Sequence, residues 1–123
     1  MNLKKLTLYS ACLLGVCVAS PALADEFVCT PVAISMYNQG SPGRIHVECS
    51  TSVAIGTNNI RFFAVPTIAS ADQNYASRVL STYTTALISS RKLTISYTAS
   101  DTSGASWGCG ATDCRSAWAV SIR

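Results

Sequence analysis

The residues best suited to binding chemistry stand near the C-terminal end of the sequence, around a pair of cysteines. Trp107 precedes Cys109 by two residues, and Asp113 and Arg115 flank Cys114. An indole face beside fixed polar groups is a combination that small sugar sites use. A guanidinium can also grip a carboxylate ligand through two parallel hydrogen bonds. The structural alternative, which we favour, is that Trp107 covers the bottom of the fold and Arg115 pairs with Asp113.

The single histidine, His46, is the second candidate. It alternates with Arg44 and Glu48 along the polar side of a β-like run. Because there is one imidazole, a ribonuclease mechanism with two histidines is excluded. We expect His46 to be a strand histidine on a solvated or interface face, and we keep Arg44 and His46 as ligand-binding candidates beside Trp107, Asp113 and Arg115. A hydrolase that depends on His46 would lose its activity in His46→Ala.

Other patterns of catalysis are missing from the sequence. No serine lies in a G-x-S-x-G elbow. The carboxylates show no spacing that marks a general acid and base pair; they are Asp25, Glu26, Glu48, Asp72, Asp101 and Asp113. We therefore expect no catalytic residue, no metal site and no cofactor.

The first 24 residues have the three parts of a signal peptide. MNLKK is the basic start, Leu6–Ala19 the apolar run and Ala22-Leu23-Ala24 the small-x-small cleavage site. The apolar run of about 14 residues is too short to span a bilayer, so we expect no membrane insertion. The sequence predicts export, to the periplasm or outside the cell, after cleavage at Ala24.

Residues 25–123 suffice for one domain with a core of modest size. Of the nine basic residues in the chain, Lys4 and Lys5 leave with the leader, so seven remain against six acidic residues, a net charge of +1. Nucleic-acid binding would require a clustered basic stripe, which is absent. We expect neither a nucleic-acid partner nor attraction to a membrane surface.

Four cysteines remain after the leader is removed: Cys29, Cys49, Cys109 and Cys114. An even number in a small exported chain predicts two disulfides, and three pairings can be drawn. We favour the local pair Cys109–Cys114, because it closes a tight loop. A zinc site is the alternative, although no paired C-x-x-C supports it.

The segments 28–37 and 44–53 predict a hairpin around the turn-forming residues 38–43. Their apolar alternation is in register when Ile34 lies across from Ile45, with Val32 across from Val47.

In this register Cys29 falls opposite Ser50, one residue away from Cys49. Because Pro31 cannot donate to the ladder, it is the natural place for a bulge that would repair the mismatch. We therefore favour the bridge Cys29–Cys49.

The third strand, Ile60–Thr67, carries apolar residues on both sides, with Phe62 and Ala64 on one face and Phe63 and Val65 on the other. Such a strand is covered on both sides, or its outer face meets another subunit.

Two further strands follow the third. The first contains Leu93, Ile95 and Tyr97, and the last is 117–122 with Trp118 assigned to the core.

The segment Ser70–Ser90 predicts the one substantial helix. Its apolar residues have the spacing of a single buried stripe: Ala76, Val79, Leu80, Tyr83, Ala86 and Leu87. Ser70 and Gln73 fit a capping box at its start. The flank of the helix is almost uncharged, which either permits packing around an axis without desolvation of charge or reflects a serine-rich surface.

The predicted order of elements is β-β-β-α-β-β, with a helix between the third and fourth strands. This order is compatible with an α+β fold in which a five-stranded barrel of the oligonucleotide/oligosaccharide-binding (OB) type is stapled by two disulfides.

The exported part also resembles the receptor-binding B subunits of AB-type bacterial toxins, in the branch of subtilase cytotoxin and typhoid toxin. The resemblance rests on the hairpin TPVAISMYNQGSPGRIHVEC with its cysteine, the helix 75–87, the strand RKLTISY and the loop CGATDC, which together span most of residues 28–115. It implies an OB barrel, a pentamer with helices around a central pore, host-cell glycans as ligands and a toxin A subunit as partner.

One departure concerns the sugar site of that branch. There an extended segment with Tyr and Ser precedes the first cysteine, whereas here only residues 25–28 do so, and no sugar-binding residue carries over. The alternative function is a monomeric periplasmic or secreted OB-fold domain with a protein or small-molecule ligand and no toxin partner.

Overall fold

The computed structural model describes residues 24–38, 42–67 and 73–123. In this part of the chain the elements are, in order, β1 (Asp25–Cys29), β2 (Pro31–Tyr37), β3 (Gly43–Ile55), β4 (Asn58–Thr67), α1 (Gln73–Ile88), β5 (Leu93–Tyr97), the 3-10 helix η1 (Ser103–Trp107) and β6 (Cys114–Ile122). The signal-peptide prediction, apart from its last residue, and Ser70 of the predicted capping box lie outside the described residues.

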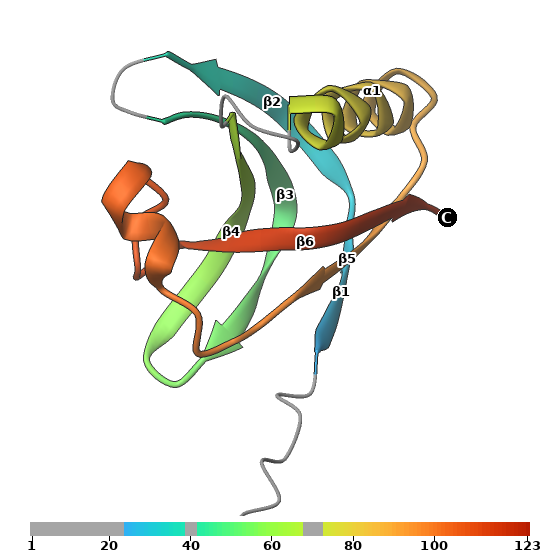
Figure 1. Ribbon diagram of the computed structural model, residues 1–123. Helices are drawn as coiled ribbons and strands as arrows, with labels where there is room; N and C mark the ends of the chain where they lie inside the picture. The colour runs from blue at the N-terminus through green and yellow to red at the C-terminus, as the bar shows by residue number, and fades with distance from the viewer. Residues whose placement is uncertain (1–23, 39–41, 68–72) are drawn as a thin grey trace, which may run out of the picture.

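The strands form one curled sheet in the order β1-β5-β6-β4-β3-β2 (Figure 1). All neighbours are antiparallel except β4 and β6, which are parallel. Only Thr30 separates β1 from β2, so the two outer strands of this order are consecutive in the chain. The Ser50 amide donates a hydrogen bond to the Thr30 carbonyl at 2.9 Å and holds this corner against β3.

The described part therefore has six strands where the sequence predicted five. The difference lies in the segment 28–37, which was predicted as one strand. The chain turns at Thr30, so that Val28 and Cys29 belong to β1, which begins at Asp25 and pairs with β5, whereas residues 31–37 form β2, which pairs with β3.

The predicted register of the β2–β3 hairpin is wrong by two residues. Ile34 lies opposite Val47, and Met36 takes the place opposite Ile45. A slip of two residues keeps every side chain on its face of the sheet, so apolar alternation cannot distinguish the two registers.

The bulge and the bridge predicted for this hairpin are both confirmed. The register of β2 shifts between Pro31 and Ala33, and Cys29 and Cys49 form a disulfide whose two residues are completely buried. The bridge ties the end of β1 to β3, beside the corner at Thr30.

The predicted helix is confirmed as α1, which lies across one end of the curled sheet and contacts β2, β3, β4 and β6 (Figure 1). Its apolar stripe is buried at Ala76, Val79, Tyr83 and Ala86, because residues three and four apart share one face of a helix. The Tyr83 hydroxyl donates to the Phe63 carbonyl at 3.3 Å, and burial raises its pKa above the ordinary value of 10.

The main core lies between α1 and the inner face of the sheet. Phe63 of β4 is at its centre, with its ring 5.5 Å from the ring of Phe27 and 5.3 Å from that of Tyr97. Strands β3 and β5 add Val47, Leu93 and other fully buried side chains.

The assignment of Trp118 to the core is wrong, because its side chain is 54% exposed. In the pairing of β5 with β6, Tyr97 lies opposite Ala117 and Ser96 opposite Ala119, so Trp118 is the extra residue of a bulge. A bulge re-aims its extra side chain, and here the indole ring points outward.

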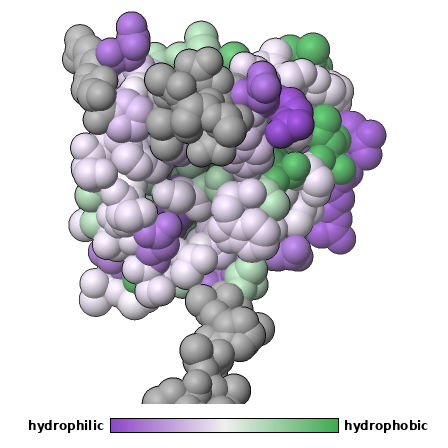
Figure 2. Space-filling view, in the orientation of Figure 1, coloured by the Kyte–Doolittle hydropathy of each residue, from purple (hydrophilic) through white to green (hydrophobic). Residues whose placement is uncertain are grey.

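Both disulfides are of the kind that forms in an oxidising compartment, extracellular or periplasmic. Within the described ranges, no helix has the length and apolar character needed to cross a membrane. On the face shown in Figure 2, most of the surface has intermediate hydropathy, and strongly hydrophilic residues occur in separate groups.

Candidate functional site

The outer face of β3 carries two of the predicted ligand-binding candidates. Along this strand Ile45, Val47 and Cys49 are buried, and the residues between them, which include Arg44 and His46, are partly exposed. Residues that pair across strands share a face. Tyr37 of β2 lies opposite Arg44, and Ala64 of β4 lies opposite His46, so all four belong to the outer face.

The segment between η1 and β6 covers the outer face of β4. The Cys109–Cys114 disulfide forms as predicted, and its two residues pack with Ala64, Phe62 and Trp107 in a small second core. The apolar residues on the outer face of β4 are therefore covered by another segment of the same chain.

Backbone hydrogen bonds add to this attachment. The Asp113 carbonyl accepts from the amides of Arg61 and Phe62 at 2.9 and 3.0 Å, just before β6 joins β4 as a parallel neighbour. The loop is therefore fixed to the sheet at its C-terminal end.

Arg44 connects this loop to β3. Its guanidinium lies 4.3 Å from the centroid of the Tyr37 ring, and its Nη1 donates to the Trp107 carbonyl at 3.1 Å. Its Nε is buried and has no hydrogen-bond partner among the described residues. The next residue after Trp107 is Gly108, whose positive φ of 91° permits the close approach of the chain to Arg44.

His46 lies between two aromatic rings. Its ring centroid is 5.1 Å from that of Tyr37 and 5.3 Å from that of Phe62. Burial and then the nearby charge of Arg44 lower the pKa of His46 below its ordinary value of 6.5, against the smaller opposite effects of Glu48 and Asp113. At neutral pH the imidazole is therefore uncharged, and it offers one donor and one acceptor.

Arg115 has a structural contact set. It is 3% exposed and donates to the carbonyls of Ala99, Ala111 and Cys114 at 2.7–2.8 Å. The ion pair predicted between Arg115 and Asp113 is not formed. Instead Asp113 is exposed at the surface, and the guanidinium of Arg115 stabilises the disulfide loop through the carbonyls of Ala111 and Cys114.

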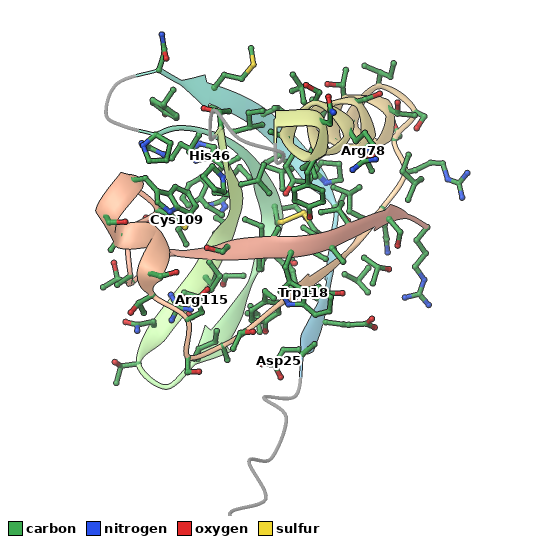
Figure 3. The ribbon with its side chains drawn as sticks, in the orientation of Figure 1. Asp25, His46, Arg78, Cys109, Arg115 and Trp118 are labelled. Atoms are coloured by element: carbon green, nitrogen blue, oxygen red, sulfur yellow. A yellow bond between two sulfur atoms is a disulfide. The ribbon has the colours of Figure 1, made fainter. Side chains whose placement is uncertain are left out.

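The structure thus brings Arg44, His46 and Trp107 together, with Asp113 near enough to act on the charge of His46. Figure 3 shows His46 and Cys109 on the same side of the molecule, with Arg115 below them. Sequence reasoning missed Tyr37 and Phe62 as members of this site. The correct strand register would have revealed both, because it pairs Tyr37 with Arg44 and Phe62 with Glu48.

We call the outer surface formed by Tyr37, Arg44, His46, Phe62 and Trp107 the β3 face. It combines ring faces with a cation and a neutral imidazole. Its residues come from three adjacent strands and from η1, so rigid elements hold all of them.

A separate pocket of about 360 Å³ lies between α1 and the sheet. Pro66, Tyr75, Ala117 and Trp118 line it, and the Tyr75 hydroxyl lies 3.4 Å from the Ala117 carbonyl, to which it donates. In Figure 3 Trp118 is well separated from His46 and Cys109. This pocket is therefore not part of the β3 face.

In the part of the chain that the structure describes, no three His, Cys, Asp or Glu side chains are grouped so that they can hold a metal ion. No protein-family model, no curated protein and no solved structure matches this chain.

Proposed function

We propose that this chain is an exported, non-enzymatic binding subunit that recognises host-cell glycans as the B component of an AB-type toxin. The observation that carries the proposal is the convergence of Tyr37, Arg44, His46 and Trp107 on one outer face. Sugar rings pack their C–H groups on aromatic faces and need directed hydrogen bonds around their edges. The β3 face offers both.

The polar groups of this face suit an uncharged or acidic ligand edge. The Arg44 guanidinium has five N–H donors, of which one is donated to Trp107. Among the described residues, Arg61 forms an ion pair with Glu48 at 3.0 Å. Arg44 has no carboxylate partner in that part of the chain. The Tyr37 ring is 42% exposed and accessible to a ligand.

The order of the strands supports an OB-type barrel. If β1 and β2 are counted as one bent first strand, this strand pairs with the second (β3) and the fourth (β5), and the third (β4) is parallel to the fifth (β6). The helix lies between the third and fourth strands. A five-stranded Greek-key barrel of the OB type has this arrangement.

The surface of α1 supports a homopentamer in which the helices surround an axis. Arg78 is the one charged residue of this helix. Its exposed flank otherwise carries the short polar residues Asn74, Ser77, Ser81, Thr84 and Thr85 and ends with Ile88, which is 77% exposed. Such a flank can be buried against a neighbouring subunit without desolvation of charge. A toxin A subunit is the proposed partner of this assembly.

A glycan array with oxidised residues 25–123 tests the binding proposal. Tyr37→Ala should lose the glycan signal, and Trp118→Ala should keep it, because both rings are exposed but only Tyr37 belongs to the β3 face. Absence of any glycan signal from the unmodified protein would refute the proposal. Equal loss in both variants would refute the assignment of the site.

The mass in solution tests the assembly. Light scattering coupled to size exclusion should give about five times the monomer mass, because the proposed assembly is a closed ring of identical subunits. A monomer would contradict the pentamer and would favour the monomeric OB-fold domain with a protein or small-molecule ligand.

A further inference from the structure

His46 lies where a change of charge would act directly on the proposed binding face. Its ring is packed between Tyr37 and Phe62, and Arg44 stands on the same side of β3, two residues away. Tyr37 touches both groups, since the Arg44 guanidinium also lies over its ring. Protonation of His46 would therefore add a second positive charge to the β3 face, beside that of Arg44.

Arg44 is also the side chain that connects β3 to η1. Its hydrogen bond to the Trp107 carbonyl joins β3 to the helix that carries the Trp107 ring. Repulsion from an adjacent imidazolium acts on the cation that makes this bond. We propose that protonation of His46 weakens the hold of Arg44 on Trp107, so that the β3 face binds its ligand at neutral pH and loosens in acid. For its biological use this inference rests on the proposed function.

The charged groups around His46 come from β3, from β4 and from the loop before β6. On β3 itself Arg44 opposes protonation and Glu48 favours it, while Glu48 is also neutralised by its ion pair with Arg61 of β4. Asp113, before β6, favours protonation.

The other described elements packed against His46 bring no charged group near it between about pH 4.5 and pH 8. Strand β2 contributes Tyr37, η1 has no titratable side chain, and both cysteines of the loop are disulfide-bonded. Burial and Arg44 outweigh the two carboxylates, so the neutral ring is the form that the fold prefers.

Nuclear magnetic resonance can follow both ends of this connection. His46 is the single histidine of the chain, so its ring proton needs no assignment in an untagged protein. In Trp118→Phe, Trp107 supplies the one remaining indole N–H. On titration from about pH 8 to about pH 4.5, we expect His46 to titrate below 6.5 and the Trp107 resonance to shift with the same midpoint.

Two variants make the test decisive. His46→Gln should abolish the Trp107 step, and Arg44→Gln should raise the midpoint of His46 and reduce the step. A Trp107 resonance that stays constant through the His46 midpoint would overturn the proposal. So would a His46 midpoint at 6.5 or above, or an unchanged step in His46→Gln. If His46→Gln or Arg44→Gln fails to fold, the midpoints of the His46 ring proton and the Trp107 indole N–H still decide whether the two groups are coupled.

A binding measurement separates this inference from the function on which it rests. The glycan found on the array should bind about fivefold or more weakly at pH 5 than at pH 7.5, and His46→Gln should remove the difference. Equal affinity at both pH values would overturn the acid sensitivity while leaving glycan binding intact. If no glycan binds, the proposed function fails, and the titration of Trp107 still decides the switch.

Discussion

Replacement of Gly108 by alanine tests the contact on which the β3 face depends. Gly108 has a φ of 91°, and a Cβ at this position would collide with the Arg44 guanidinium. Because the end of an arginine side chain is flexible, Arg44 would swing away rather than push the loop off the sheet. It would then lose its hydrogen bond to Trp107 and its position over the Tyr37 ring.

The expected loss of stability has two parts. A non-glycine residue in a left-handed conformation costs about 1 to 2 kcal/mol. A hydrogen bond from a charged donor contributes about 1.5 to 3 kcal/mol in the folded state, and a partly exposed cation–π contact about 0.5 to 1 kcal/mol. Since a displaced guanidinium regains contact with water, we expect about 1 to 2 kcal/mol from these two contacts together.

Gly56→Ala is the matched control. Gly56 has a φ of 59°, and a Cβ there would meet no atom within 4 Å, so this variant reports backbone strain alone. Urea unfolding of oxidised residues 25–123 should show Gly108→Ala to be less stable than Gly56→Ala by about 1 to 2 kcal/mol. In an Arg44→Ala background the two costs should become equal. If the excess cost of Gly108→Ala persists without Arg44, the proposed role of this arginine is wrong.

Three further measurements probe other parts of the fold. Loss of the Cys29–Cys49 bridge in a Cys29→Ser, Cys49→Ser double variant should lower the free energy of unfolding by about 3 kcal/mol, and loss of Cys109–Cys114 by about 2 kcal/mol. The bridges span 20 and 5 residues, so a larger loss at the shorter loop would argue against an origin in chain entropy. Trp118→Ala should change stability by less than about 1 kcal/mol, because the ring is 54% exposed, and a loss of several kcal/mol would mean that the bulge does not turn it outward. Stability should also decline as the pH falls below 6.5, since the pKa of His46 in the folded state lies below that value and the unfolded chain binds the proton first. Urea midpoints at pH 7.5 and pH 5.5 should reveal this decline in the native protein and a smaller one in His46→Gln.

The parts of the fold that sequence predicted well are those with one dominant physical signal. The apolar stripe of α1 has a single periodicity, and its members Val79, Tyr83 and Ala86 are buried as expected. The bulge at Pro31 follows from the inability of proline to donate a hydrogen bond, and the bridge Cys29–Cys49 was also predicted correctly, although from a hairpin register that is wrong by two residues. Each of these inferences needs only local information.

The errors occur where two arrangements satisfy the same local pattern. The slip of two residues in the hairpin preserves the faces of Ile34 and Met36. The bulge at Trp118 breaks the alternation of β6 without a proline or glycine to mark it. Likewise the sequence shows that Arg115 stands near a disulfide, but its three carbonyl acceptors include Ala99, 16 residues away, which only the folded loop brings near.

Three residues of the β3 face, Arg44, His46 and Trp107, were candidates from the sequence, but their close placement in the fold was not predicted. Trp107 and the pair Arg44 and His46 were treated as separate candidates, because about 60 residues divide them in the chain. The parallel pairing of β4 with β6 brings them together, and such a long-range pairing leaves no trace in local periodicity.

Besides the backbone hydrogen bonds of Asp113, three side-chain contacts attach η1 and the loop after it to the sheet, and these contacts differ in their exposure to a ligand. The Cys109–Cys114 disulfide and Arg115 are both buried, with exposures of 2–4%, so a ligand cannot reach them. Arg44 is the fastener that lies on the β3 face itself, with a buried Nε and donors that remain unassigned within the described residues. A ligand that binds Arg44 therefore competes with, or reinforces, its hydrogen bond to Trp107. In the function that we propose, recognition at the β3 face and the position of η1 are therefore linked through one side chain, and His46 lies beside it.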